Sequence, residues 1–375
     1  MTFVLAGTLS GRGGIQTHLF WLARALLESG NRVRVISLGP LLSPEDKARV
    51  CLLQAFGDFA TICPQFNQEG RLNTPFRTVW NLINELRHLV PHVYLACGTG
   101  WNLFLPAIFS RACPIRVFHE VMSGEMTGKW DSRLSVTWGF QHVVAQASRV
   151  AVTFERAFGW RHEIRVLPAF PEALEITSTI PRTQSIRIPV GKARAAFFSR
   201  LVPHKGALWL VKQWPQLSDC LAELHIYGSG PEKEPIEKLI QDNQWNERVF
   251  CHGPYPDGQA YVDILSNFDL TLLPTLGAEG APLVLLESMA CGVPFVAYGV
   301  GGIPDYANPD CIIVNPSSTD AFLLSIQALV TRLSRGEVDQ ERLQTFYADT
   351  FSYNRLKSRW LVFFESFQMN SAQQA

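Results

Sequence analysis

Several patterns that mark a metal or redox protein are missing from this 375-residue sequence. Its eight cysteines occur singly, without a C-x-x-C pair, and neither they nor the nine histidines show a zinc-ligand spacing. No D-x-D pair is present, so a divalent metal held by two neighbouring carboxylates is not expected. We therefore expect reduced cysteines, a reducing compartment and no metal cofactor.

Signals for spanning a membrane or for secretion are also missing. No run of about 18 apolar residues occurs. The apolar stretch at residues 1–9 is short and has no basic leader, so it is not expected to be a signal peptide. The expected location is the cytoplasm, with peripheral contact to the inner face of a membrane left open. Without a basic stripe or a zinc module, nucleic acid is not an expected partner.

Two blocks of alternating strand and helix patterns are present instead. The composition, 47% hydrophobic and 18% charged, is typical of a globular protein, and the length favours two domains. A passage rich in Pro, Ser and Thr at residues 168–189 is the expected linker. The expected strands are 3–6, 32–38, 60–63, 93–97, 115–119, 149–154, 165–167, 195–199, 224–227, 249–252, 270–273, 295–297 and 311–314. The expected helices are 15–30, 43–56, 73–89, 101–111, 207–218, 232–243, 258–266, 283–289, 318–335, 338–348 and 353–368. The pattern predicts an α/β fold with doubly wound parallel sheets.

The stretch at residues 275–305 carries the clearest chemical pattern. Glu279 and Glu287 flank a small-residue turn and the start of an apolar helix, and Pro282 suits the first turn of that helix. Free amides at a helix N-terminus bind phosphate, and two carboxylates accept hydrogen bonds from hydroxyls. The amides in question belong to Ala281, Leu283 and Val284. The pattern indicates a sugar nucleotide; the alternative is a helix with two solvated acids.

A pair of cations opens the second block. Arg200 and Lys205 follow the strand at 195–199 and precede a glycine turn, where they are suited to clamp a diphosphate. Stabilising a departing diphosphate is electrostatic catalysis. The alternative interpretation is two ordinary surface cations.

Two features of the first block invite a functional interpretation. Gly13 and Gly14 at a helix start allow a ligand to approach the backbone closely, although a tight structural turn has the same sequence. The loop lacks G-x-G-x-x-G, which argues against a dinucleotide site. His119 falls at the C-terminal end of a strand, where open α/β sheets bind ligands, but a structural histidine fits equally well.

The first block also has a basic excess, with 17 Lys and Arg against 11 Asp and Glu in residues 1–170. With Trp130 and Trp138 in the irregular segment 124–148, this excess permits a lipid-linked acceptor at a membrane surface. The alternative for that segment is a surface helix with aromatic anchors in the core.

Taken together, these motifs resemble the GT-B-fold retaining glycosyltransferases of family 4, over the whole length and in the expected order. The matching segments are Gly13-Gly14, SRLVPHKG at 199–206, IYGSGP at 226–231, EGAPLVLLESMACGVPFVA at 279–297 and GVGGIPD at 299–305. The resemblance implies two Rossmann-like domains facing across a cleft. The first comprises residues 1–170 with a returning C-terminal helix at 355–375 and binds the acceptor. The second, residues 171–354, binds the donor.

The resemblance also implies roles for individual residues. Glu279 would contact the sugar hydroxyls, Glu287 the ribose, and His119 would lie near the anomeric carbon. Arg200 and Lys205 would hold the diphosphate, which makes Glu279, His119, Arg200 and Lys205 the expected catalytic residues. The expected donor-binding residues are Glu287, Gly13, Gly14, Gly280, Ala281, Leu283, Val284, Gly228 and Pro254. The family usually needs no metal. This chain departs from it at Ala281-Pro282, Asp305 and Gln16, and Pro282 removes one amide donor.

The predicted function is transfer of a hexose from a nucleotide diphosphate sugar to an acceptor hydroxyl with retention of configuration. The acceptor is a glycan, a lipid-linked sugar or a small-molecule hydroxyl. The alternatives are a sugar-nucleotide epimerase or phosphorylase on the same fold, or a non-catalytic subunit that binds a sugar nucleotide.

Overall fold

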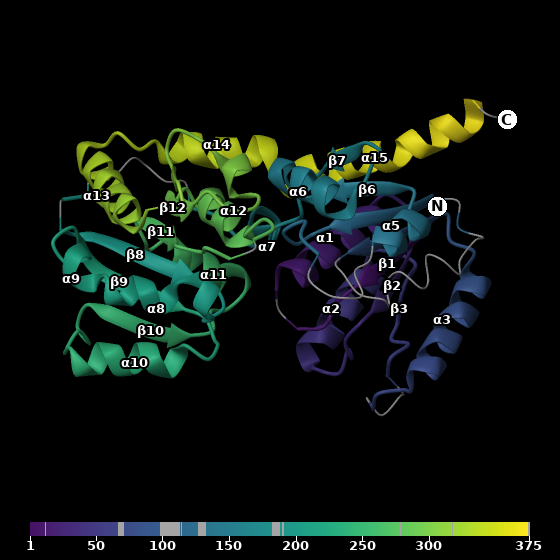
Figure 1. The fold of residues 1–375 in the computed structure, drawn as a ribbon, viewed down its shortest axis with the longest axis horizontal. Helices are drawn as coiled ribbons and strands as arrows, with labels where there is room; N and C mark the ends of the chain where they lie inside the picture. The colour runs from purple at the N-terminus through teal and green to yellow at the C-terminus, as the bar shows by residue number, and fades with distance from the viewer. Residues whose placement is uncertain are drawn as a thin grey trace. The chain divides into compact units, whose positions relative to one another are not determined.

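The computed structural model describes residues 1–11, 13–66, 71–97, 113, 115–126, 133–181, 188–189, 191–277, 279–316 and 318–373. The chain divides into two compact units (Figure 1). Unit 1 comprises Met1–Glu172 and Tyr353–Ala375, and unit 2 comprises Ala173–Ser352. The boundaries expected from the sequence lie two residues from these. The expected helix at 101–111 falls outside the described residues.

Unit 1 is built on a parallel sheet of seven strands in the order β3-β2-β1-β4-β5-β6-β7. The order reverses between β1 and β4, as in a doubly wound sheet, so the carboxyl ends of these two strands flank the switch point. The strands are β1 (Thr2–Gly7), β2 (Arg32–Ser37), β3 (Phe59–Ile62), β4 (Val93–Cys97), β5 (Ile115–Glu120), β6 (His142–Ala145) and β7 (Ile164–Val166).

Caps and apolar stripes fix the helices of unit 1. Ser43 accepts a hydrogen bond from the amide of Asp46, and Thr74 accepts one from the amide of Arg77, so each residue caps a helix start. Proline follows each cap at the first helical position, where its missing N–H is tolerated. The helices are α1 (Gly14–Glu28), α2 (Pro44–Ala55), α3 (Pro75–Leu89), α5 (Arg133–Gly139), α6 (Ser148–Phe158) and α15 (Tyr353–Gln373).

One predicted strand is wrong: residues 149–154 belong to helix α6, and the strand is β6 at 142–145. Val150, Phe154 and Phe158 are buried at a spacing of four, which is the period of one helix face. Gly159 ends the helix with φ 64°, a backbone conformation that glycine adopts readily. The apolar residues were therefore helical in period, although their short run had indicated a strand.

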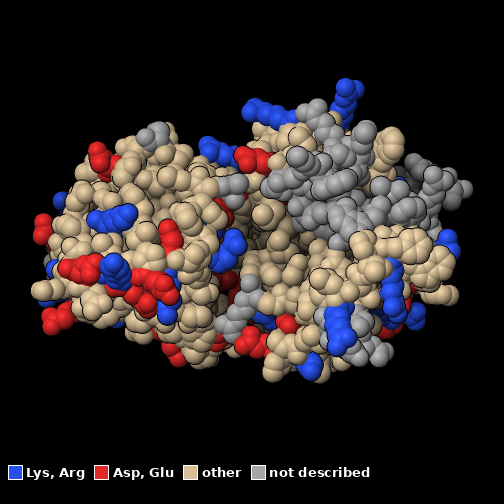
Figure 2. Space-filling view, turned by 60° about the horizontal axis from the view of Figure 1, so that its bottom comes forward, with Lys and Arg blue, Asp and Glu red and all other residues tan. Residues whose placement is uncertain are grey.

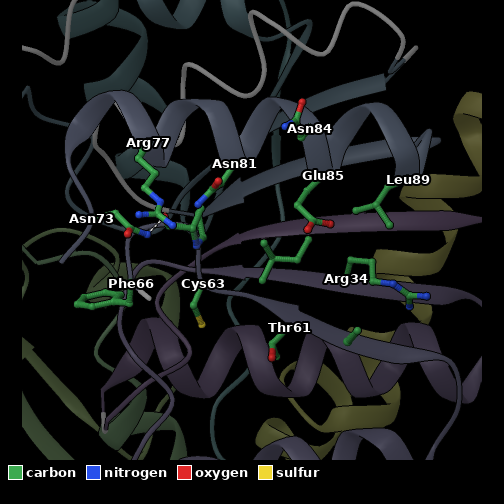
Figure 3. Close-up of a pocket in the computed structure, with 13 residues that line it drawn as sticks. Arg34, Thr61, Cys63, Phe66, Asn73, Arg77, Asn81, Asn84, Glu85 and Leu89 are labelled. Atoms are coloured by element: carbon green, nitrogen blue, oxygen red, sulfur yellow. Dashed lines mark hydrogen bonds between the residues drawn. The ribbon is translucent and has the colours of Figure 1, made fainter. Parts of the chain in front are cut away.

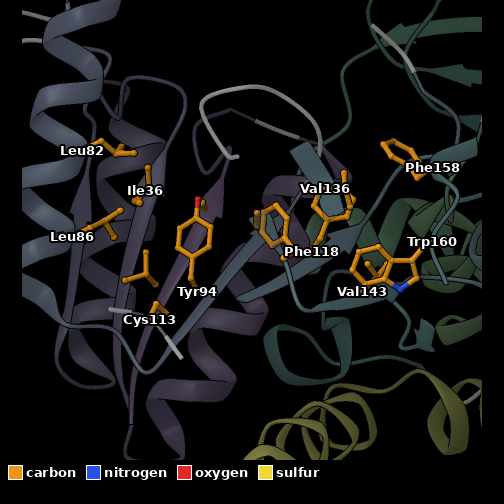
Figure 4. Packing of buried hydrophobic residues seen from close by; sticks show 14 of the residues in the cluster. Ile36, Leu82, Leu86, Tyr94, Cys113, Phe118, Val136, Val143, Phe158 and Trp160 are labelled. Carbon is orange, nitrogen blue, oxygen red and sulfur yellow. The ribbon is translucent and has the colours of Figure 1, made fainter. Parts of the chain in front are cut away.

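The core of unit 1 is dominated by aromatic side chains packed between the sheet and α3, α5 and α6 (Figure 4). Phe118 on β5 packs against both Phe140 and Phe154, with ring centroids 5.4 and 5.6 Å apart. Leu82 and Leu86 bring α3 onto the same cluster. Burial of each such side chain contributes about 1.5–3 kcal/mol.

The C-terminal helix α15 also belongs to unit 1. Phe364 packs edge-on against Phe3 of β1, with ring centroids 4.9 Å apart, and the indole of Trp360 donates a hydrogen bond to the backbone oxygen of Pro168. At its start, Tyr353 and Lys357 both bond Glu28 at the end of α1. The last helix of the chain is thus anchored in the core formed by the first strand.

Unit 2 contains a parallel sheet of six strands in the order β10-β9-β8-β11-β12-β13. The order again reverses, here between β8 and β11, and the expected doubly wound fold is confirmed for both units. The strands are β8 (Ala193–Phe198), β9 (Leu221–Tyr227), β10 (Val249–Gly253), β11 (Leu270–Leu273), β12 (Phe295–Tyr298) and β13 (Ile312–Val314).

One helix prediction and the linker prediction need correction. The expected helix at 207–218 is broken into two, because Pro215 lacks the amide that would continue the ladder. The expected linker at 168–189 contains helix α7, whose Leu174 is fully buried. The helices are α7 (Leu174–Thr177), η1 (Pro203–Lys205), α8 (Ala207–Lys212), α9 (Trp214–Leu217), α10 (Lys233–Asp242), α11 (Gly258–Leu265), α12 (Leu283–Ala290), η2 (Ile303–Tyr306), α13 (Thr319–Arg335) and α14 (Gln340–Thr350).

The surface carries charges of both signs. On the face drawn in Figure 2, the Lys and Arg side chains of the described residues stand in separate groups among Asp and Glu side chains. Within the described ranges, no helix has both the length and the apolar composition that crossing a membrane requires.

Candidate active site

The switch point of the sheet in unit 2 brings two of the predicted residues together. Strands β8 and β11 are neighbours, and Lys205 follows the first of them while Glu279 follows the second. The carboxyl ends of parallel strands share one edge of a sheet, and a ligand binds beyond that edge where the strand order reverses. Strands β9, β10 and β12 are parallel to these two, so the loops that follow them begin at the same edge.

Lys205 and Glu279 form a buried ion pair. The Lys205 Nζ contacts Oε1 of Glu279, and the two side chains are only 11% and 9% exposed. The Thr275 hydroxyl lies 3.0 Å from the same carboxylate oxygen and 3.1 Å from the backbone oxygen of His204. A buried ion pair is costly to break, because removing one partner leaves the other charge uncompensated. The site therefore holds one cation and one anion in fixed positions.

Close backbone packing holds both ends of this pair. Gly206 has φ 79°, and a Cβ there would lie 2.7 Å from the backbone oxygen of Pro274, so the turn after Lys205 requires glycine. Gly301 has φ 53°, and its Cβ would lie 1.8 Å from the backbone oxygen of Glu279. Gly302 donates a hydrogen bond to the backbone oxygen of Gly280 at 2.6 Å. The second glycine loop thus locks the backbone that presents Glu279.

Helix α12 begins at Leu283, where the sequence predicted its start, but Pro282 lies outside its first turn. Pro282 is the N-cap with extended backbone, φ −69° and ψ 107°, and Leu283 is the first helical residue. The prediction that Pro282 occupies the first helical turn is therefore wrong. No side chain caps this end and no acid stands in the first turn, so the amides of Leu283 and Val284 retain the partial positive charge of a helix N-terminus.

Glu287 lies in the same helix, one turn further in. It is 7% exposed, and its Oε2 accepts a hydrogen bond from the hydroxyl of Tyr261 at 2.9 Å. Burial raises the pKa of Tyr261 well above its ordinary value, and the neighbouring Glu287 carboxylate raises it further, so this hydroxyl stays a donor. Tyr261 on α11 thereby fixes the orientation of the carboxylate.

The remaining predicted residues of unit 2 lie in adjacent loops. Arg200 and Pro254 are exposed after β8 and β10. Gly228 after β9 has φ 145°, and a Cβ there would lie 1.8 Å from the backbone oxygen of Ser199, so the two loops touch. Leu201 also donates a hydrogen bond to the backbone oxygen of Ser229 at 2.8 Å. The backbone that carries Arg200 is therefore positioned by the glycine turn.

The glycine loop of unit 1 opens helix α1. Gly13 is the N-cap and Gly14 the first helical residue, and both are exposed. Gln16 donates a hydrogen bond to the backbone oxygen of Ser10 at 3.2 Å, and Gly11 donates one to Asp46 of α2 at 2.9 Å. The loop is thus tied at both ends while the amides at the helix start face outward.

His119 is fully buried at the end of β5. Its ring packs edge-on against His18 of α1 and Trp360 of α15, at centroid distances of 4.7 and 4.9 Å. Nδ1 of His18 accepts a hydrogen bond from the backbone amide of Phe170, which places the proton of the neutral ring on Nε2. Burial lowers the pKa of His18 to about 3. Burial also lowers the pKa of His119 well below its ordinary value, and the adjacent His18 lowers it further.

His18, Cys97 and His119 offer metal-ligand atoms within 4.8 Å of one another. Burial raises the pKa of the Cys97 thiol far above its usual range, which opposes the thiolate form that binds metals. His18 has already engaged Nδ1. The donor set therefore fits a neutral packed cluster better than a metal centre.

The structure thus brings Lys205 and Glu279 into contact and places Glu287 in the helix that begins beside them. His119 and the Gly13-Gly14 loop both lie in unit 1. His18, one turn after Gly14 on α1, packs against the His119 ring and so connects the two. Sequence reasoning missed Thr275, Tyr261, His18 and Trp360. His18 alone left a signal, because it falls on the buried face of α1 together with Leu19 and Leu22.

Part of the chain is similar to known glycosyltransferases. Residues 192–332, less than half of the chain, match the family described as Glycosyl transferases group 1. The GDP-mannose-dependent monoacylated alpha-(1-6)-phosphatidylinositol monomannoside mannosyltransferase of Corynebacterium glutamicum is 31% identical over 181 residues, 44% of this chain and 47% of that protein. A GDP-mannose-dependent alpha-(1-6)-phosphatidylinositol monomannoside mannosyltransferase of Mycolicibacterium smegmatis is 36% identical over 114 residues, 28% of this chain and 30% of that protein. The chain spans less than half the length of these curated relatives.

A solved structure matches over nearly the whole length. Anabaena Alr3699/HepE in complex with UDP-glucose superposes with a TM-score of 0.77 at 18% identity, covering 98% of this chain and all of that one. The two α/β units therefore have the GT-B fold.

Proposed function

We propose that this chain is a glycosyltransferase that moves a hexosyl group from a nucleotide diphosphate sugar to an acceptor hydroxyl with retention of configuration. The observation that carries the proposal is the Lys205–Glu279 pair at the switch point of unit 2, one turn from a helix N-terminus. A fixed cation for phosphate, a fixed carboxylate for hydroxyls and free helix amides are what a sugar nucleotide requires.

The reaction breaks the bond between the anomeric carbon and the diphosphate oxygen and forms a bond from that carbon to the acceptor oxygen on the same face. Negative charge develops on the leaving diphosphate. Arg200, Lys205 and the amides of Leu283 and Val284 stabilise that charge, which is the main catalytic contribution. The departing phosphate oxygen takes the proton that the acceptor hydroxyl loses, so no other acid or base is needed. Lysine has three donors, so Lys205 can bond phosphate while it keeps Glu279.

Donor recognition falls to the carboxylates. Glu279 accepts hydrogen bonds from hydroxyls of the sugar, and Glu287, oriented by Tyr261, accepts them from the ribose. His119 is assigned a place near the anomeric carbon. Because burial keeps its ring neutral, it would act there through hydrogen bonds rather than as a cation. No metal is required for these steps.

The relatives named for mannosyl transfer to phosphatidylinositol mannosides favour a lipid-linked acceptor and peripheral contact with a membrane. Helix α3 of unit 1 supports that contact. Phe76 and Trp80 stand one turn apart and are 81% and 57% exposed, and Arg77 and Arg87 lie on the same helix. Exposed aromatic rings beside cations are typical of helices that rest in the headgroup layer. Trp138, for which the sequence left a membrane contact open, is 72% exposed, and Trp130 lies outside the described residues.

The experiment that tests the proposal incubates the protein with UDP-glucose or GDP-mannose and a lipid-linked or simple glycoside acceptor. We expect nucleoside diphosphate release that depends on the acceptor, and NMR of the product should show the anomeric configuration of the donor. An inverted product contradicts retention. Turnover that requires inorganic phosphate indicates a phosphorylase, an epimerised nucleotide sugar indicates an epimerase, and binding without turnover indicates a non-catalytic subunit.

A further inference from the structure

A cavity of about 890 Å³ lies in unit 1 between helix α3 and strands β2 and β3 (Figure 3). Its volume falls in the upper part of the ~300–1,000 Å³ range that is common for small-molecule sites. None of the residues assigned above to the donor or to catalysis lines it. The cavity is therefore separate from the proposed active site within unit 1.

The helix side of the cavity is polar and geometrically fixed. Arg77, Asn81 and Glu85 follow one another at a spacing of four, and Figure 3 shows them extending from α3 toward the strands. The neighbouring face of α3 buries Leu82 and Leu86 in the core. Because the buried face anchors the helix, the polar stripe is held at a constant height above the sheet.

The charges in and beside the cavity nearly cancel. Arg34 on the sheet side is ion-paired with Asp58, with 2.7 Å between Nη2 and Oδ1. Arg77 and Glu85 contribute one charge of each sign on the helix side. The lining thus carries two cations and one anion, and Asp58, outside the lining, neutralises one of the cations. A cavity with so little net charge has little preference for an anionic ligand.

Hydrogen-bonding capacity remains open in the cavity. The amide of Asn73 donates to the backbone oxygen of Pro64 at 3.1 Å, which leaves its oxygen as an acceptor. Asn81 also lines the cavity, and within the part of the chain that the structure describes its side-chain amide makes no hydrogen bond, so its donor and acceptor are available to a ligand. Phe66 adds one aromatic ring at the same end.

We propose that this cavity is a second binding site, which takes a neutral polyhydroxylated ligand. Amides and balanced charges pair with hydroxyl groups, which are donors and acceptors at once, and the Phe66 ring offers a flat apolar surface to the C–H face of a sugar ring. The identification of the ligand as a glycan rests on the proposed glycosyltransferase function. The neutral, polar character of the site rests on its lining residues alone.

The test uses α-linked mannotriose as the neutral probe and the full chain, with binding followed by ligand-observed NMR and calorimetry. We expect saturable binding with a Kd near 1 mM, which corresponds to about −4 kcal/mol. Asn81→Ala should weaken binding about fivefold or more; Asn81 is half-buried on α3, and alanine is the strongest helix former, so the variant should still fold. Gln54→Ala, an exposed amide on α2, is the matched control and should bind like the wild type.

Further arms separate this site from the donor site. Saturating UDP-glucose and the variant Lys205→Ala should both leave mannotriose binding unchanged, whether or not the protein proves to be a transferase. The inference is overturned if mannotriose does not bind saturably, if Asn81→Ala binds it like the wild type, or if inorganic phosphate binds the cavity more tightly than mannotriose does.

Discussion

The Lys205 ammonium group contacts the Glu279 carboxylate across 74 positions of the sequence, and the pair is nearly closed off from solvent. The two residues meet because β8 and β11, which precede them, are neighbours in the sheet. The pair also connects two functions of the proposed site, since Lys205 serves the leaving group and Glu279 serves the transferred sugar.

Tyr261→Phe should impair donor binding more than chemistry. The substitution removes the hydrogen bond that orients the buried Glu287 carboxylate, and a hydrogen bond to a charged group contributes about 1.5–3 kcal/mol. We expect KM for the nucleotide sugar to rise about tenfold or more with kcat little changed. Tyr298→Phe, which removes only a 3.4 Å bond to the Ser318 backbone, is the control. A loss confined to kcat would assign Glu287 to the chemical step instead.

Gly228→Ala should destabilise unit 2. The new Cβ would lie 1.8 Å from the backbone oxygen of Ser199 at φ 145°, so the loop that carries Arg200 must move. We expect a loss of about 2 kcal/mol or more in chemical denaturation. Gly258→Ala is the control, because Gly258 has φ 63° and open space where the Cβ would lie. It measures the cost of the left-handed backbone alone, which should be only about 1–2 kcal/mol. Equal losses for both variants would contradict the close packing of the two loops.

The fold was predictable from the sequence wherever local sequence, that is, residues within a few positions of one another, determines the secondary structure. Strand ends followed by glycine turns predict from the sequence alone that Lys205 and Glu279 lie at one edge of the sheet. The strand prediction for residues 149–154 was wrong because four apolar residues in a short segment also fit a strand. Only Phe158, further along the chain, completes the helical period. Tyr261 was not predictable, since its role depends on Glu287, which lies 26 positions away on another helix.

The buried histidine cluster should make stability depend on pH. The folded-state pKa of His18, about 3, lies below the ordinary value of 6.5, so the unfolded chain takes up the proton first as the pH falls. The contribution to stability is complete above that ordinary value and is lost as the pH falls toward the folded pKa. Between pH of about 6.5 and about 5 the loss is about 2 kcal/mol.

His18→Asn tests that assignment, because an asparagine oxygen can replace Nδ1 as the acceptor for the Phe170 amide. Urea denaturation at neutral pH and at a pH of about 5 should show a smaller difference for the variant than for the wild type, by about 2 kcal/mol. The same pH dependence in both proteins would show that His18 does not stay neutral in the folded state.

The docking of α15 should weaken in acid. Burial alone would raise the pKa of Glu28, but hydrogen bonds from Lys357, Arg24 and Tyr353 outweigh it and lower the pKa. Their contribution is present above the ordinary carboxyl pKa and is lost as the pH falls through the lowered value. At neutral pH, Glu28→Gln should cost about 1 kcal/mol, or roughly 2–4 °C in Tm. In acid the two Tm values should converge; a constant gap would mean that the Glu28 charge contributes nothing.

Membrane contact through α3 predicts that the double variant Phe76→Ser and Trp80→Ser binds vesicles of anionic phospholipid at least about tenfold more weakly than the wild type, because it loses two apolar anchors. Sedimentation with the vesicles measures the bound fraction. Leu324→Ser, on the exposed face of α13 in unit 2, is the control and should bind like the wild type. If Trp138→Ser weakens binding and the double variant does not, the contact lies at α5 instead.

Nucleoside diphosphate release by Lys205→Ala and Glu279→Gln is the measurement that tests the proposed site most directly. Lys212→Ala, an exposed cation on α8, serves as the control, and thermal melting verifies that every variant is folded. With the donor that the wild type uses, we expect each site variant to lose about 10²-fold or more in kcat/KM and Lys212→Ala to retain full activity. Folded Lys205→Ala and Glu279→Gln proteins that release nucleoside diphosphate at the wild-type rate would contradict the account.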